Sequence, residues 1–122
     1  LKIHTTDKDN ADPDSSSSSW QPRVMCLIYT HSNRHEYARA IAETYAPRCD
    51  GYLAASNMTD KSIGAVNLLH EGPEAYENMW LKVRNMWVYA YDNYLDDYDI
   101  FLMGGDDLYV IPENLRSMYA TA

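Results

Sequence analysis

Four short stretches of the chain are predominantly apolar, at residues 24–29, 51–56, 65–69 and 99–103. A short apolar run between polar segments is typical of a strand buried on both faces, as in a parallel sheet. The first run is the clearest, because Pro22 precedes it and a polar cluster follows it. We therefore predict four strands at these positions.

Between these runs, apolar residues recur every three or four positions, which predicts helices. Asn33 followed by Glu36 resembles a capping box at the start of a first helix, and Pro47 ends that helix. A long helix should begin at Glu74, and a last helix at Pro112. The first helix has its apolar stripe at Tyr37, Ile41 and Tyr45, and the long helix is expected to bury Tyr76, Trp80, Val83, Trp87, Ala90 and Tyr94.

The alternation of strands and helices predicts an α/β fold, with a mostly parallel sheet and flanking helices. In open sheets of this kind, ligands bind outside the carboxyl ends of the strands. Two loops are predicted at that edge, residues 30–33 after the first strand and residues 104–107 after the fourth. A single ligand could therefore contact both loops.

The chain has 122 residues, enough for one domain. Residues 1–22 are polar and include a serine run, so we expect a disordered stem or linker there. Residues 23–122 should form the ordered unit. The chain does not begin with Met and ends soon after a helix start, so we expect a fragment of a longer protein. Because no run of about 18 apolar residues is present, a membrane anchor of the parent protein would lie upstream of Leu1.

Negative charge is concentrated late in the chain. The net charge is −8, and residues 91–107 hold six aspartates without Lys or Arg. Such a block repels phosphate backbones, which argues against nucleic acid as a partner. It also offers the oxygen ligands that divalent cations prefer. For the aspartates between Asp92 and Asp99, a solvated helix end and turn is the simpler interpretation.

Two cysteines and one sequon bear on the cellular compartment. In a reducing compartment Cys26 and Cys49 would be free thiols, whereas in an oxidising one they could form a bridge. Asn57-Met58-Thr59 is an N-glycosylation sequon, which would lie on an exposed loop of a secreted protein. Together these features favour the secretory lumen.

The segment Gly104-Gly105-Asp106-Asp107 carries the candidate chemistry. Glycines permit unusual backbone angles and close approach of a ligand. Two carboxylates at the end of a buried strand repel each other and lose part of their hydration. A bound Mn²⁺ or Mg²⁺ would relieve both effects, and it could bridge the carboxylates to a nucleotide diphosphate and assist its departure. The alternative is a plain turn between strand and helix.

The segment from Phe101 to Arg116 resembles the metal-site segment of the β1,3-glycosyltransferases, above all the core 1 β1,3-galactosyltransferases, with the Fringe enzymes as cousins. That family has a hydrophobic pair, two residues, three aspartates, then Thr or similar, Tyr and Val, and later Asn-Leu-Arg. Residues 23–26 resemble the family's first strand with its cysteine, residues 44–49 its Thr-Trp-Ala-x-Arg-Cys motif, and residues 80–82 its aromatic pair and lysine. The resemblance covers about residues 23–118.

This resemblance implies a Rossmann-like GT-A fold, of which the chain would be the N-terminal, nucleotide-sugar-binding half. It implies inverting transfer of galactose from UDP-galactose to N-acetylgalactosamine on Ser or Thr of a glycoprotein acceptor. The implied cofactor is Mn²⁺, with Mg²⁺ as the alternative. The implied compartment is the Golgi lumen, with the endoplasmic reticulum lumen as the alternative, and a homodimer is compatible with the family.

The resemblance also implies roles for individual residues. Cys26 and Cys49 match a family disulfide, Asp107 matches the third, metal-ligating aspartate, and Asp106 matches the middle one. The lysine of the long helix matches Lys82, for which a solvated helix lysine is the alternative interpretation. The expected site residues are Thr30, Lys82, Gly105 and Asp106 for the donor, Asp107 and Asp106 for the metal, and Asn57 for the glycan.

The chain also departs from the family pattern. Gly105 stands where the family has its first aspartate, and the family's catalytic base lies in a second half that is absent here, so we nominate no catalytic residue. Two other functions stay open: a non-catalytic relative that acts as a chaperone of the core 1 enzyme, and an acidic α/β domain with a regulatory cation site. His31 is expected near the donor loop, whereas His35 and His70 are expected on the surface.

Overall fold

The computed structural model describes residues 20–120 of the chain. The stem predicted over residues 1–22 therefore lies outside the described residues, except for residues 20–22. In chain order, the strands and helices are β1 (Val24–Tyr29), α1 (His35–Glu43), β2 (Gly51–Ser56), β3 (Ala65–Asn67), α2 (Met79–Tyr94), β4 (Ile100–Gly105) and α3 (Pro112–Ala120). Short 3₁₀ turns lie at Ser32–Arg34, Ala46–Arg48, Lys61–Ile63 and Tyr76–Asn78.

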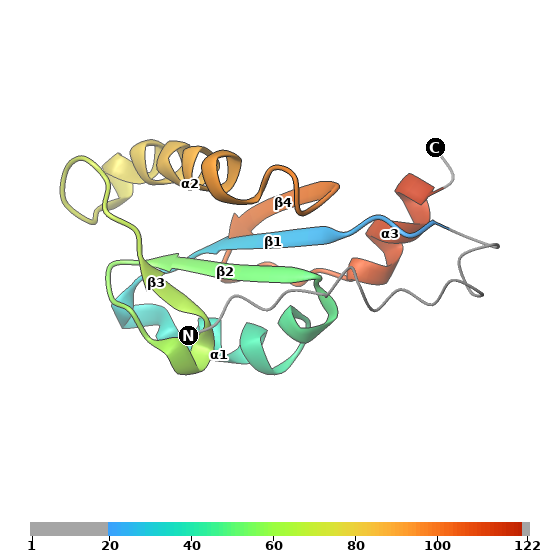
Figure 1. Ribbon diagram of the computed structural model, residues 1–122. Helices are drawn as coiled ribbons and strands as arrows, with labels where there is room; N and C mark the ends of the chain where they lie inside the picture. The colour runs from blue at the N-terminus through green and yellow to red at the C-terminus, as the bar shows by residue number, and fades with distance from the viewer. Residues whose placement is uncertain (1–19, 121–122) are drawn as a thin grey trace.

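The four strands form one parallel sheet in the order β3-β2-β1-β4. β1 lies between β2 and β4 at its centre (Figure 1), and five consecutive residues of β1, Val24 to Ile28, are fully buried. A central strand of a parallel sheet has neighbours on both edges and helices over both faces, so it accepts an uninterrupted apolar run. The predicted α/β fold with a parallel sheet is confirmed.

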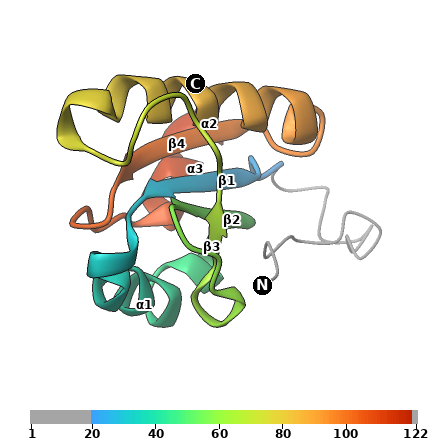
Figure 2. The same ribbon diagram turned by 90° about the vertical axis from the view of Figure 1, so that its left-hand side faces the viewer.

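Helices cover both faces of the sheet. α2 lies over one face, and α1 and α3 lie over the other (Figures 1 and 2). Side chains of β1 alternate between the two resulting cores. Cys26 and Ile28 face α1, where Tyr45 is fully buried, whereas Met25 and Leu27 face α2.

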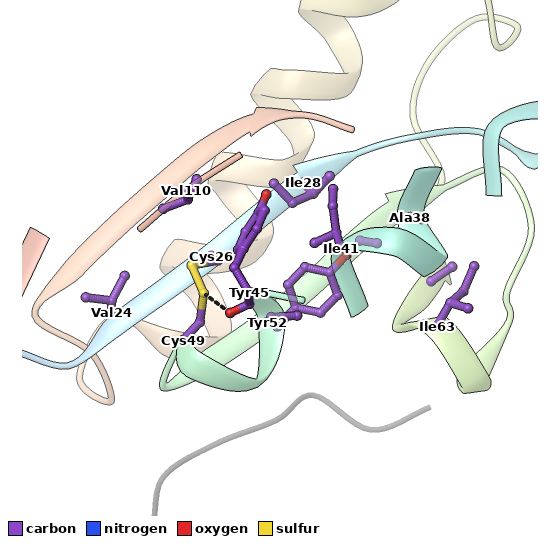
Figure 3. Packing of buried hydrophobic residues seen from close by; sticks show 13 residues of the cluster. Val24, Cys26, Ile28, Ala38, Ile41, Tyr45, Cys49, Tyr52, Ile63 and Val110 are labelled. Carbon is purple, nitrogen blue, oxygen red and sulfur yellow. Dashed lines mark hydrogen bonds between the residues drawn. A yellow bond between two sulfur atoms is a disulfide. The ribbon is translucent and has the colours of Figure 1, made fainter. Parts of the chain in front are cut away.

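A disulfide joins Cys26 in β1 to Cys49, just before β2, as Figure 3 shows. The two Cα atoms are 6.2 Å apart, and both cysteines are buried in the core beneath α1. The bridge therefore fixes the connection through α1 against the central strand. Of the two interpretations that the sequence left open, the structure shows the bridge.

The predicted capping box of α1 is wrong. The helix begins at His35, and Asn33 lies within the 3₁₀ turn that precedes it. The Nδ1 atom of His31 accepts the backbone N–H of Asn33 at 3.3 Å, so His31 caps this turn. Because the turn begins directly after the strand, the helical start lies further along the chain than the capping pattern indicated. Ile41 and Tyr45 are buried in the core as predicted, whereas Tyr37 is 43% exposed. The helix ends at Glu43, before the predicted end at Pro47, so Tyr45 lies just beyond it.

The long helix α2 exists and buries Ala90 as predicted, but the rest of its buried stripe differs from the prediction. Lys82, Met86 and Ala90 are buried, whereas Trp80 and Trp87 are 64% and 43% exposed. Both stripes have helical spacing, so periodicity alone does not choose between them. Packing against the sheet decides which residues are buried. Met86 and Ala90 join the core between α2 and the sheet, and Lys82 donates a hydrogen bond to the backbone carbonyl of Thr30.

Three further element boundaries differ from the prediction. α2 begins at Met79 rather than Glu74, because the 3₁₀ turn Tyr76–Asn78 comes first. β4 extends through both glycines to Gly105, so the loop predicted over residues 104–107 begins only at Asp106. In the short third strand, pairing ends at Asn67 instead of Leu69. The acidic pair therefore lies directly at the carboxyl end of a strand.

Candidate functional site

The site lies where β1 and β4 end side by side. Tyr29 and Gly105 are register partners in the sheet, so the next residue of each strand meets the other at the edge. These two residues, Thr30 and Asp106, are both buried, and the Thr30 hydroxyl donates to Oδ2 of Asp106 at 2.9 Å. The prediction that the two loops share one edge of the sheet is confirmed.

Arg34 completes this contact with two further donors to the same carboxylate. Its Nε lies 2.9 Å from Oδ2 of Asp106, and its Nη2 lies 3.0 Å from Oδ1. The guanidinium also stacks on Tyr37, 4.1 Å from the ring centroid. Asp106 is 9% exposed, so this ion pair is largely withdrawn from water on the carboxylate side.

Sequence reasoning did not single out Arg34. It is one of ten basic residues in the chain, and it lies 72 positions from its partner. The available signal was its place, four residues after Thr30, in the loop that was expected to face the ligand. Nothing in the local pattern indicates that its side chain turns toward the acidic pair.

The two glycines of the acidic segment do not have the unusual backbone angles that were expected. The described glycines with positive φ are Gly64 and Gly72, whereas Gly104 and Gly105 are in extended strand conformation. What they provide is space. A Cβ atom at Gly105 would lie 3.0 Å from Oδ1 of Asp107 and 3.1 Å from Cε2 of Tyr29.

Lys82 is buried beside the site, so the interpretation as a solvated helix lysine is wrong. Its Nζ donates to the backbone carbonyl of Thr30 and to Oε1 of Glu74. Burial raises the pKa of Glu74, but hydrogen bonds from Lys82 and His70 outweigh burial, and the pKa lies below its ordinary value. Lys82 thus ties α2 and the segment before it to the end of β1.

His70 is likewise not the surface residue that was expected. Its side chain is 9% exposed, and Nε2 lies 2.8 Å from Oε2 of Glu74. His35 contacts Ser56 through Nε2 and the hydroxyl, 2.7 Å apart, at the carboxyl end of β2. Both histidines are half-buried structural contacts close to the same edge of the sheet.

The ends of β1 and β4 border a cavity of about 510 Å³. Its polar lining includes Thr30, Arg34, Lys82 and Asp106, and three of its other lining residues are Tyr or Trp. The remaining lining residues are Tyr29, His31, Glu74, Tyr76, Met79, Trp80 and Val83. Thr30, Lys82 and Asp106, three of the four predicted donor-binding residues, therefore share one cavity, and His31 lies in its wall as expected.

Asp107 points elsewhere. It is exposed and borders a second, smaller hollow of about 320 Å³ beside α1, together with Tyr109 and Thr44. Asp106 lines both hollows. The structure therefore separates the two aspartates: one is bound within the protein, and the other faces solvent.

The predicted metal site can be tested against these donors. Both oxygens of Asp106 already accept hydrogen bonds from Arg34 and Thr30, which leaves Asp107 as the acidic ligand with accessible oxygens. Within residues 20–120, no group of three or more His, Cys, Asp or Glu side chains is arranged to hold a metal ion. A cation at Asp107 would need the ligand's own phosphates to complete its coordination.

Asn57, the predicted glycosylation residue, lies just after β2 and is exposed. Its Oδ1 accepts the backbone N–H of Ser32 at 2.8 Å, which leaves its amide nitrogen, the atom a glycan would modify, outside that contact. Glycosylation of Asn57 stays a prediction.

No family model matches the chain. Over 97 residues it is 31% identical to glycoprotein-N-acetylgalactosamine 3-beta-galactosyltransferase 1 of Xenopus laevis. This chain is a distant homologue of that galactosyltransferase. The matched region is 79% of the chain but 26% of the relative, so the chain spans about a quarter of the relative's length.

The homology to a galactosyltransferase and the Cys26–Cys49 bridge both fit the secretory pathway. The helices among residues 20–120 are all too short or too polar to cross a membrane. A sugar donor and an acceptor are what homology to a glycosyltransferase implies.

Proposed function

We propose that this chain is the donor-binding part of a β1,3-galactosyltransferase-like enzyme that uses UDP-galactose. The observation that carries the proposal is the convergence of Thr30, Arg34, Lys82 and Asp106 on one cavity at the carboxyl edge of a parallel sheet. Homology to a galactosyltransferase over 97 residues supports the choice of a sugar nucleotide as ligand. The division into a stem over residues 1–22 and a donor-binding unit over residues 23–122 is part of the proposal.

The cavity offers two kinds of wall for such a donor. Arg34 provides charged N–H donors suited to phosphate oxygens. Tyr76 and Trp80 line the same cavity and are exposed, so their aromatic rings are available for a nucleobase to stack on. Lys82 does not meet the ligand as a free cation, because Glu74 neutralises it, and it acts by positioning Thr30.

The proposed reaction is inverting transfer of galactose to N-acetylgalactosamine on Ser or Thr of a glycoprotein. The acceptor hydroxyl attacks the anomeric carbon as the bond to UDP breaks, and a base takes the hydroxyl proton. We assign that base to none of the described residues. Their part is to bind the donor and hold its diphosphate at the end of β1 and β4.

The cofactor that the resemblance implies, Mn²⁺ or alternatively Mg²⁺, would have the exposed Asp107 as a ligand, because both oxygens of Asp106 accept hydrogen bonds from Arg34 and Thr30. A bound ion would supply Lewis-acid stabilisation of the departing diphosphate. One carboxylate is a weak site alone, so the described residues by themselves would hold such an ion only weakly. Asp106 could ligate the ion only if its ion pair with Arg34 were broken.

The proposed compartment is the Golgi lumen, with the endoplasmic reticulum lumen as the alternative. The buried disulfide and the exposed sequon at Asn57 support an oxidising, glycosylating compartment. Secretory expression tests this directly. A glycan that glycosidase removes from the wild-type chain and that is absent from Asn57→Gln would support the assignment, and an unglycosylated secreted chain would count against Asn57 as a site.

The donor proposal is tested by calorimetry of the chain with UDP-galactose, UDP-N-acetylglucosamine and GDP-mannose, each with and without Mn²⁺. We expect both uridine donors to bind and GDP-mannose to bind at least tenfold more weakly. Lys82→Met should weaken binding by releasing Thr30, whereas Arg39→Gln, at an exposed arginine of α1, should leave it unchanged. Absence of UDP-sugar binding in every condition would refute the proposal.

A second candidate, a non-catalytic chaperone-like relative, is favoured by one specific observation. Gly105 contributes no carboxylate, and Asp106 is held by an internal ion pair. Transfer to an N-acetylgalactosamine-bearing peptide by the parent protein separates the two functions. Turnover supports the enzyme, and donor binding without turnover supports the non-catalytic relative.

A further inference from the structure

The acidic pair already has a cation, and it belongs to the protein. Two adjacent carboxylates at a strand end require compensating positive charge, especially where one of them is buried. Asp106 obtains it from Arg34 through both of its oxygens. We propose that Arg34 takes the place of a divalent cation at this pair, and that its guanidinium binds the donor's diphosphate without a metal ion. The binding of the donor's diphosphate by Arg34 rests on the proposed function.

The geometry makes Arg34 a fixed group rather than a passing surface charge. Nε and Nη2 bind the carboxylate side by side, the Thr30 hydroxyl holds the same carboxylate from β1, and the Tyr37 ring supports the guanidinium from α1. A metal ion that used Asp106 would first have to displace a charge-assisted, two-point contact. The Arg34 side chain still retains 37% exposure, so its other edge remains accessible.

Arginine can serve Asp106 and a phosphate at the same time. A guanidinium has five N–H donors in a fixed plane. Nε and Nη2 are the atoms that contact Asp106, and among residues 20–120 no acceptor is found for Nη1. Because Arg34 lines the cavity of about 510 Å³, the free donors are available to a ligand there.

The surrounding charges agree with a metal-independent site. Lys82 and Glu74 neutralise each other within the same cavity wall, as do Arg34 and Asp106. Asp107 is exposed toward the neighbouring hollow, and Gly105 adds no further carboxylate. A diphosphate in the cavity therefore meets paired charges and open N–H donors, and not the excess of carboxylates that would require a divalent ion.

The first arm of the test measures Mn²⁺ binding in the absence of nucleotide, by calorimetry and by the electron paramagnetic signal of free Mn²⁺. Wild type should show no saturable binding at millimolar Mn²⁺. Arg34→Gln frees Asp106 beside Asp107 and should bind Mn²⁺ at least tenfold more tightly than wild type. The double variant Arg34→Gln with Asp106→Asn should lose this gain in Mn²⁺ affinity. Arg34→Lys, which keeps the charge, and Arg39→Gln should both behave as wild type.

Thermal melts check that each variant is folded before its result is used. Wild-type Mn²⁺ binding as tight as that of Arg34→Gln would overturn the inference, because Arg34 would then not occupy the cation position. A folded Arg34→Gln that gains no Mn²⁺ binding would overturn it as well.

The second arm measures UDP binding in EDTA. Wild type should bind, Mn²⁺ should change its Kd by less than threefold, and Arg34→Gln should lose at least tenfold while Arg39→Gln does not. UDP binding that requires Mn²⁺ would overturn the metal-independent site. If no variant binds UDP under any condition, the proposed function fails, and the Mn²⁺ arm still decides whether Arg34 replaces the cation.

Discussion

The hydroxyl of Tyr45 donates a hydrogen bond to the backbone carbonyl of Leu108 at 3.0 Å. Tyr45 is fully buried just after α1, whereas Leu108 follows the acidic pair. Burial raises the pKa of Tyr45 to about 12, so the phenol stays protonated and remains a donor at neutral pH. One core residue thereby holds the loop that carries Asp106 and Asp107 against the helix.

Tyr45→Phe should lower the free energy of unfolding by about 1 kcal/mol, because the backbone carbonyl of Leu108 loses the hydroxyl that donates to it. Urea unfolding measures the change. Tyr52→Phe is the matched control, since the Tyr52 hydroxyl is buried without a hydrogen-bond partner among the described residues. That variant should be neutral or slightly more stable. Equal losses in both variants would show that the Leu108 contact contributes nothing specific.

Reduction of the Cys26–Cys49 bridge should destabilise the protein by about 3 kcal/mol, through the added entropy of the unfolded chain. The bridge spans 23 positions of sequence and is buried in the core. Urea unfolding with and without reductant gives the difference, and Cys26→Ala with Cys49→Ala should show no further effect of reductant. Two free thiols in mass spectra of non-reduced, secreted protein would contradict the bridge.

Lys82→Met alone should cost about 3 kcal/mol, because it leaves the partly buried Glu74 carboxylate without its main partner. Glu74 retains its contact with His70, which limits the loss. Lys82→Met combined with Glu74→Gln should cost less than the sum of the single changes, and a double-mutant cycle measures that coupling. Additive losses would show that Lys82 acts by packing alone.

The pH dependence of stability should carry the signature of Glu74. Its pKa in the folded protein lies below the ordinary value of 4.5, so ionised Glu74 contributes stability that is fully present above that value. The contribution is lost as pH falls through the lowered pKa. Unfolding free energies of wild type and Glu74→Gln should therefore differ by a constant amount at neutral pH and converge in acid. Convergence toward higher pH instead would contradict the assignment.

Much of the fold follows from local pattern. The apolar runs of β1 and β2 mark strands buried on both faces, and strands alternating with helices give a parallel sheet. The carboxyl ends of parallel strands lie at one edge of the sheet, and this rule correctly predicted that Thr30 and Asp106 come together. These features are predictable because they depend on the average burial of whole segments.

The structure alone decided which side chains meet. α2 carries two stripes of helical spacing, and only contact with the sheet selects Met86 over Trp80 and Trp87. Arg34 gives no local sign of its partner, which lies 72 positions later in the chain. An ion pair is set by where two strand ends come together and how their side chains point, and the sequence states neither until the sheet is assembled.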